Sequence, residues 1–256
     1  MSSTARRVEL KSPADLDKMR RAGRIAGRVL AELGKLVRPG VSTKELDRAA
    51  EKMMREAGAV PTFLGYRGYP ASICASLNEE VVHGIPTPKR VLREGDIVSL
   101  DLAATFEGFV GDTAATYAVG TISDEDRRLM DVTFASLEKG IERMRSGNRL
   151  GDVSNAVQSC AEAAGFGVVR DYVGNGIGRQ MHEEPAVPNY GTAGTGMRLE
   201  VGMTLALEPM ITAGSWKTKV LPDGWTVVTQ DGSRAAHFEH TVALTEAGPE
   251  ILTLGS

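Results

Sequence analysis

The sequence predicts a mixed α/β protein of 256 residues that folds as one domain from two similar halves. Two observations predict this class. A pattern of two helices followed by several strands occurs twice along the chain, and small residues recur at a fixed spacing of 107 positions. A duplicated unit of this kind folds around a pseudo-two-fold axis, so matched residues of the halves should face each other. We place the halves at about 12–120 and 121–250, within a single domain over 1–256.

Each half begins with two helices. Ser12 can cap the first helix, Pro13 suits its first turn, and Pro39-Gly40 ends it. Ser123 can cap the first helix of the second half in the same way. The expected helices cover 12–40, 42–58, 123–147 and about 152–165, with strands over about 72–119 and over much of the chain beyond 165.

The spacing of 107 residues continues from the helices into the strands. Glycine and alanine are common in this chain, so a single matched pair carries little weight, whereas six pairs on one diagonal favour a duplication. The pairs are Gly40 with Gly147, Ala49 with Ala156, Ala57 with Ala164, Gly58 with Gly165, Gly95 with Gly202, and Asp101 with Glu208.

Composition excludes several classes of protein. Hydrophobic residues make up 42% and charged residues 25%, which is typical of a soluble globular protein, and a net charge of −3 argues against nucleic acid as the main partner. No apolar run is long enough to span a membrane, and the first ten residues lack the apolar region of a secretory signal. The two cysteines, Cys74 and Cys160, have no CxxC spacing, so a reduced cytoplasmic protein is expected.

An apolar hairpin over 96–119 carries two acids on one face. Its turn residues are Glu107-Gly108. If these two residues form the loop, Asp101 lies opposite Ala114, and Asp112 lies diagonal to Asp101 on the same face. A shifted register makes the two acids direct partners. Both registers place two carboxylates side by side on an otherwise apolar ribbon.

Two further acids, Glu208 and Glu239, also lie in apolar, strand-like runs. Burying four bare anions costs free energy, and close like charges raise their pKa values. A separate salt bridge could satisfy any one of them, but the set of four favours two divalent cations. Oxygen ligands with an imidazole suit manganese, iron, cobalt or zinc, and two ions about 3.5–4 Å apart can activate a water.

Three glycines, Gly174, Gly176 and Gly178, fall within the stretch VGNGIGRQMHEEP and predict a close approach of the backbone to a partner. The spacing G-x-G-x-G differs from the dinucleotide-binding G-x-G-x-x-G, so a nucleotide loop is a poor interpretation. The chain also contains neither HExxH nor G-x-S-x-G, which excludes a zincin helix and the serine-hydrolase elbow.

Six segments together resemble type I methionine aminopeptidases, in order and over nearly the whole chain: SICASLNEEVVHGIP, VSLDLA, GDTAATYAVG, GNGIGRQMHEEP, LALEPM and DGWTVVTQDGSRAAHFEHT. The resemblance implies the pita-bread fold, which is a duplicated α/β unit around a central antiparallel sheet. It also implies a cytosolic dinuclear metallopeptidase that removes the initiator methionine when the next residue is small. Its partners would be the N-termini of nascent peptides, with a transient ribosome contact, and neither a nucleic acid substrate nor a membrane.

The resemblance also assigns metal ligands. Asp101 matches the acid that binds one ion alone, and Asp112 and Glu239 match the two acids that bridge the ions. Glu208 matches the acid on the other ion, which in the family also serves as the proton shuttle for the attacking water. Asn175 departs from the family, which has a ligand histidine at this position. An asparagine offers a neutral, shorter oxygen ligand, so a weaker second ion and impaired activity are expected.

Two histidines and an apolar pocket complete the assignment by resemblance. His83 matches a histidine near the substrate amine, and His182 matches one that donates to the scissile carbonyl. A pocket of aromatic and sulfur-containing side chains suits a methionine thioether. Its residues would be Phe63, Tyr66, Tyr69, Cys74, Met181 and Trp225, with Trp225 carried by a surface loop over 215–225.

Two other functions remain open at this point. Asn175 is compatible with a binding protein of the same fold whose peptidase activity has weakened or been lost. A proline-specific peptidase of the same fold is a third possibility, although the Cys74 and Trp225 pocket argues against it.

Overall fold

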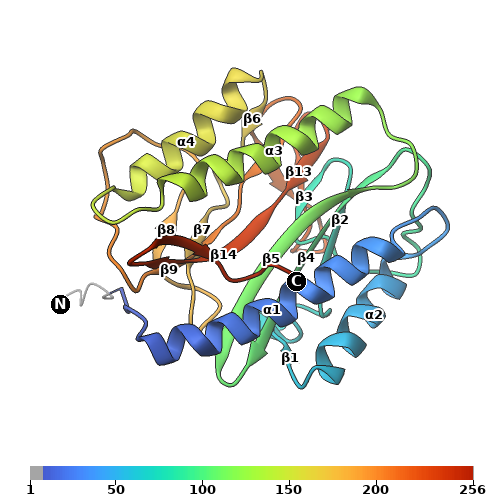
Figure 1. The fold of residues 1–256 in the computed structure, drawn as a ribbon. Coiled ribbons are helices and arrows are strands. Elements are labelled where there is room, and N and C mark those ends of the chain that lie inside the picture. Colours follow the sequence, from blue (N-terminus) through green and yellow to red (C-terminus); the bar gives the residue numbers. More distant parts are fainter. Residues whose placement is uncertain (1–7, 256) are drawn as a thin grey trace.

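A computed structural model describes residues 8–255 of the chain (Figure 1). The inference about a secretory signal concerns the first residues, of which 1–7 lie outside the described range. Within 8–255, no helix is both long enough and apolar enough to cross a membrane.

Two pairs of helices lie on opposite sides of the view in Figure 1, with α3 and α4 at the top, α1 running across the lower part and α2 at the lower right. Ser12 and Ser42 each accept a hydrogen bond from the backbone N–H three residues later, so a capping box begins α1 and α2; the cap at Ser12 is the one that the sequence predicts. The helices are α1 (Pro13–Leu36), α2 (Thr43–Glu56), α3 (Asp124–Arg143) and α4 (Leu150–Ala163).

Three helix boundaries differ from the sequence prediction. Helix α1 ends at Leu36, before the predicted end at Pro39-Gly40. Helix α3 ends at Arg143 instead of near Gly147, because the side chain of Asn148 donates to the Arg143 carbonyl and turns the chain away. Helix α4 begins at Leu150, two residues before the expected start, because the Asp152 carboxylate accepts the Arg149 N–H and caps the helix there.

A nine-stranded antiparallel sheet forms the centre of the molecule. Its strands follow the order β1-β4-β5-β14-β9-β7-β8, with β2 paired to β4 and β15 paired to β14. The strands are β1 (Val60–Pro61), β2 (Cys74–Leu77), β4 (Ile97–Phe106), β5 (Phe109–Ala118), β7 (Gly174–Gly176), β8 (Glu183–Val187), β9 (Thr204–Leu207), β14 (Glu239–Thr245) and β15 (Gly248–Ile251).

Two three-stranded sheets flank the central sheet. One has the order β13-β10-β6 and the other β11-β12-β3. Their strands are β3 (Glu80–Val82), β6 (Gly167–Val168), β10 (Met210–Thr212), β11 (Thr218–Val220), β12 (Val227–Thr229) and β13 (Ala235–His237), and a short 3₁₀ turn covers Tyr66–Gly68.

The β4–β5 hairpin has the first of the two expected registers. Glu107 (φ 49°) and Gly108 (φ 77°) form its two-residue loop, and both take the positive φ that a tight hairpin turn requires. Asp101 pairs with Ala114 and Asp112 pairs with Ala103, so the two acids are diagonal neighbours. The alternative register is therefore wrong.

The helices determine which face of the sheet carries the site. Leu100 and Leu102 on β4 are fully buried in a cluster with Leu33 of α1 and Leu46 of α2. Because successive side chains of a strand point to opposite faces, Asp101 points away from these helices. The apolar face therefore supports the fold, and the opposite face remains for polar groups.

The duplication predicted from the sequence is visible in the structure. Helices α2 and α4 begin and end 107 positions apart, and so do strands β1 and β6. Three of the matched glycine pairs also share a left-handed backbone: Gly40 with Gly147, Gly58 with Gly165, and Gly95 with Gly202. The pita-bread fold is thus confirmed, and the outer limits of the halves remain a prediction.

Candidate metal centre and substrate cavity

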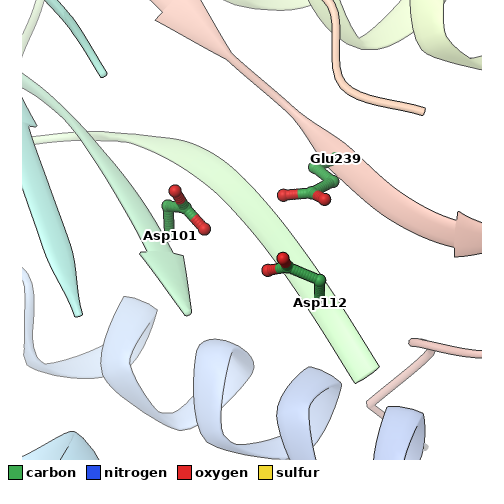
Figure 2. Close-up of side chains that lie close together, drawn as sticks. All are labelled: Asp101, Asp112 and Glu239. Atoms are coloured by element: carbon green, nitrogen blue, oxygen red, sulfur yellow. The ribbon is translucent and has the colours of Figure 1, made fainter. Parts of the chain in front are cut away.

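Three carboxylates from three adjacent strands converge at the middle of the sheet (Figure 2). Asp101 lies on β4, Asp112 on β5 and Glu239 at the start of β14, and one oxygen of each lies within 4.8 Å of the others. Ala114 of β5 pairs with Asp101 on one side and with Glu239 on the other. Its small side chain leaves space between the two acids.

The protein itself does not satisfy these carboxylates. The Oδ1 atoms of Asp101 and Asp112 are buried without a hydrogen-bond partner, and within residues 8–255 no lysine or arginine forms a salt bridge with Asp101, Asp112 or Glu239. Burial raises the pKa of Asp112 to about 7. Burial, followed by repulsion from the neighbouring acids, raises the pKa values of Asp101 and Glu239 as well. Unpaired, converging carboxylate oxygens are suited to a divalent cation.

Glu208 lies beside the cluster of Asp101, Asp112 and Glu239 but is not one of the three acids whose oxygens converge. It follows the last residue of β9, and burial, with repulsion from Asp112 and Asp101, raises its pKa. Its Oε2 atom is 4.0 Å from Nε2 of His237, a buried nitrogen that has no hydrogen-bond partner. This neighbour was not predicted from the sequence, because the contact depends on the pairing of β13 with β10, where His237 lies opposite Met210.

Asn175 is buried in the middle of β7, and its side-chain amide is held by the backbone. Its Nδ2 donates to the carbonyl oxygens of Gly176 and Met181, at 2.9 Å each. Carbonyl oxygens only accept hydrogen bonds, so this contact determines the orientation of the amide. The Oδ1 atom is consequently the only polar atom that Asn175 can offer to a metal ion.

The glycines around Asn175 allow a close approach, as expected, but to the protein's own chain. A Cβ at Gly174 would collide with the Ala206 carbonyl on β9, and one at Gly176 would collide with the Glu184 carbonyl on β8. A Cβ at Gly178 would collide with the side chain of Lys11. These glycines therefore let β7 pack tightly between its neighbours, which places Asn175 against the site.

Two histidines lie on the open side of the carboxylates. His182 is exposed at the rim, and its Nδ1 is 2.8 Å from the Tyr66 hydroxyl. His83 has a left-handed backbone (φ 61°), and its ring meets the rings of Tyr172 and Trp225 edge to face. Burial, followed by the charge of His182, lowers the pKa of His83 to about 4, so its imidazole is neutral near pH 7.

All of the residues that the sequence suggested as ligands, proton donors or pocket residues line one cavity of about 290 Å³. Aromatic rings meet edge to face on its apolar side: Tyr69 and Trp225 have centroids 5.0 Å apart, and Phe63 and Tyr69 have centroids 6.4 Å apart. The sequence did not indicate Arg67 and Tyr172, which also line the cavity. The expected loop carrying Trp225 is present, although part of it forms β11.

Comparisons with known proteins agree with this geometry. The profile of Metallopeptidase family M24 matches residues 17–246. A methionine aminopeptidase of Clostridium acetobutylicum is 53% identical over 247 residues, which cover 96% of this chain and 99% of the relative. The crystal structure of a methionine aminopeptidase from Thermotoga maritima superimposes with a TM-score of 0.95 at 47% identity, and covers 96% of this chain and 99% of that one.

A prolidase from Pyrococcus furiosus shares the fold, with a TM-score of 0.75, but is only 19% identical to this chain. The match covers 95% of this chain and 65% of the prolidase, which shows the fold alone. The high-identity matches over nearly full length lie instead with methionine aminopeptidases. On these grounds, the chain belongs to the methionine aminopeptidases of Metallopeptidase family M24.

Proposed function

We propose that this protein is a metal-dependent aminopeptidase that removes the initiator methionine from nascent peptides in the cytoplasm when the second residue is small. One observation carries the proposal: a single cavity joins three converging buried carboxylates to a pocket of aromatic and sulfur-containing side chains. The carboxylates account for a metal-dependent hydrolysis, and the pocket accounts for the choice of the first residue.

The proposed metal centre has two unequal parts. Asp101, Asp112 and Glu239 would hold one ion, because their oxygens converge and two of these oxygens lack any other partner. Glu208 and the Oδ1 of Asn175 would complete a second position together with the shared acids. Bound divalent ions, which we propose to be manganese, iron, cobalt or zinc, supply positive charge that polarises the scissile carbonyl and acidifies a water.

The second position is proposed to be the weaker one. The Asn175 amide is neutral, and its nitrogen is held by the carbonyls of Gly176 and Met181, so the side chain cannot advance toward an ion without losing these hydrogen bonds. Imidazole is a better ligand than a neutral amide oxygen for these metals. We therefore expect full activity only at a high metal concentration.

The protein's own groups would perform the remaining steps. Glu208, at the end of β9, would accept a proton from the attacking water and pass it to the leaving amine. His182 would donate a hydrogen bond to the scissile carbonyl oxygen as negative charge develops there. His83, which is neutral because of its burial, would contact the substrate amine.

The apolar side of the cavity supports methionine as the first residue. Phe63, Tyr69 and Trp225 present ring edges and faces to the space, with Cys74 and Met181 beside them. A polarisable thioether gains from contacts with aromatic rings and sulfur. A charged side chain would lose its hydration in this space without gaining a partner, so lysine should be rejected.

A peptide assay with metal analysis tests the proposal. The purified protein should cleave Met-Ala-Ser much faster than Leu-Ala-Ser or Lys-Ala-Ser, lose this activity after chelation, and regain it with manganese or cobalt. Equal cleavage of the three peptides would contradict the assigned pocket. Undiminished cleavage by metal-free protein would contradict the metal centre. Metal binding without cleavage would support the alternative that Asn175 marks a binding protein of this fold.

A further inference from the structure

Tyr66 contacts more than the proposed methionine pocket. Its hydroxyl oxygen lies 2.8 Å from Nδ1 of His182, and the two rings lie 5.5 Å apart at an angle of 39°. A neutral imidazole carries one proton, and the hydrogen bond at one ring nitrogen determines which nitrogen holds it. The direction of the hydrogen bond with Tyr66 is therefore linked to the ring nitrogen that His182 presents as a donor to the cavity.

The chain around Tyr66 is held in a tight turn. The Tyr66 N–H donates to Phe63, the Tyr69 N–H donates to Tyr66, and the Gly65 N–H donates to Tyr69, each at 2.9 Å. Arg67 adopts a left-handed backbone (φ 49°), which a non-glycine residue keeps only where its surroundings impose it. The turn thus fixes the position of Tyr66 from both sides.

Arg67 makes Tyr66 the better hydrogen-bond donor. The guanidinium carbon lies 5.3 Å from the centroid of the Tyr66 ring. A cation at the ring face withdraws electron density from the phenol and strengthens its O–H as a donor. Partial burial of the ring at the rim, followed by the charge of Arg67, lowers the pKa of His182, which favours the neutral imidazole with one unprotonated nitrogen. A strengthened donor and a free acceptor therefore meet at this contact.

We propose that Tyr66 is a positioning residue that donates its hydroxyl proton to Nδ1 of His182 and so keeps the imidazole proton on Nε2. In this form Nε2–H can donate to a carbonyl oxygen of the substrate. The opposite tautomer would present a lone pair, which repels that oxygen. The catalytic part of this inference rests on the proposed role of His182, whereas the tautomer itself does not.

Nitrogen-15 correlation spectra of the metal-free protein test the tautomer directly. The chain has only four histidines, and a His182→Asn variant identifies the signals of His182. In the unmodified protein at about pH 8, which lies above the usual histidine pKa, we expect Nε2 to be protonated and Nδ1 to be unprotonated. In Tyr66→Phe, both signals should move toward the values of a tautomer mixture. The Tyr117→Phe variant is the matched control, because the Tyr117 hydroxyl donates to the Leu30 carbonyl and does not line the cavity.

Kinetics of the metal-loaded protein give a second measurement. Phenylalanine keeps the ring that lines the pocket, so KM for Met-Ala-Ser should stay within about twofold, whereas kcat should fall about tenfold with the loss of one orienting hydrogen bond. The Tyr117→Phe variant should match the unmodified protein in both constants. A purely structural role for the hydroxyl would lower the folded fraction without changing the tautomer of His182.

The two measurements separate this inference from the proposed function. Protonation of Nδ1 in the unmodified protein, or an unchanged tautomer in Tyr66→Phe, would overturn the role of Tyr66 whatever the peptide assay shows. The expected tautomers in a protein that cleaves no peptide would support the positioning role and would refute only the proposed function.

Discussion

Raising the pH of the metal-free protein should weaken its fold, because four buried acids with raised pKa values lose their protons, and the contribution of Asp112 can be measured separately. Burial raises the pKa of Asp112 from its ordinary value of 3.8 to about 7. An acid whose pKa is higher in the folded than in the unfolded state binds its proton more tightly when folded. Its contribution to stability is therefore full below about pH 4 and is lost as the pH rises toward 7. Between about pH 5 and pH 7, the loss is roughly 2 kcal/mol, since each pKa unit corresponds to about 1.4 kcal/mol and the carboxyl group is half ionised at pH 7.

Three histidines act in the opposite direction over part of this range. Burial lowers the pKa values of His83, His237 and His240, so these residues stabilise the fold as the pH rises through the unfolded value near 6.5. An Asp112→Asn variant separates the two effects. It keeps all three histidines and replaces the carboxylate with a neutral group of the same shape.

Urea unfolding of both proteins at about pH 5 and pH 7, with a chelator present, measures the difference. Relative to Asp112→Asn, the unmodified protein should lose roughly 2 kcal/mol of unfolding free energy between the two pH values. Manganese should restore this stability at pH 7 in the unmodified protein and much less in the variant, because a bound cation offsets the buried charge. Parallel pH dependence of the two proteins would refute the inference that Asp112 is buried without a compensating partner.

Two further predictions concern the proposed chemistry. Asn175→His should tighten the weaker metal position and raise turnover, as measured by calorimetric metal titration with kinetics alongside; if the asparagine form already binds two ions tightly and works as fast, Asn175 is a competent ligand. His182→Ala should lower turnover by about 10²–10³ while leaving the metal content unchanged, because one lost donor to a developing oxyanion costs that much; a collapse of metal content in elemental analysis would instead make His182 a ligand.

The sequence predicted most of the fold because its signals were local or periodic. Capping residues such as Ser12 and Ser123 located helix starts, and the Glu107-Gly108 turn predicted the observed register of the central hairpin as one of two alternatives. The spacing of 107 residues predicted the duplication. In the structure, α2 and α4 begin and end at this spacing, and three matched glycine pairs share a left-handed backbone. Helix ends were less certain, because a single side chain such as Asn148 changes where the last turn finishes.

The site was only partly predictable. The four acids could be found because a carboxylate in an apolar run is unusual, and the surrounding motifs supplied the histidines and the pocket. Arg67, Tyr172 and His237 were missed, because each reaches the site through tertiary contacts that leave no pattern in neighbouring residues. The hydrogen bonds that orient the Asn175 amide likewise depend on the folded loop and could not be predicted from residue types.

The junction between the halves has a consequence for how the protein assembles. Asp101 and Asp112 come from the first half and Glu239 from the second. The two halves join where β5 pairs with β14. There the backbone N–H of Asp112 donates to the side chain of Thr241, 129 positions later in the sequence. Neither half alone possesses the three converging oxygens. Uptake of an ion during refolding should therefore report the docking of the two halves.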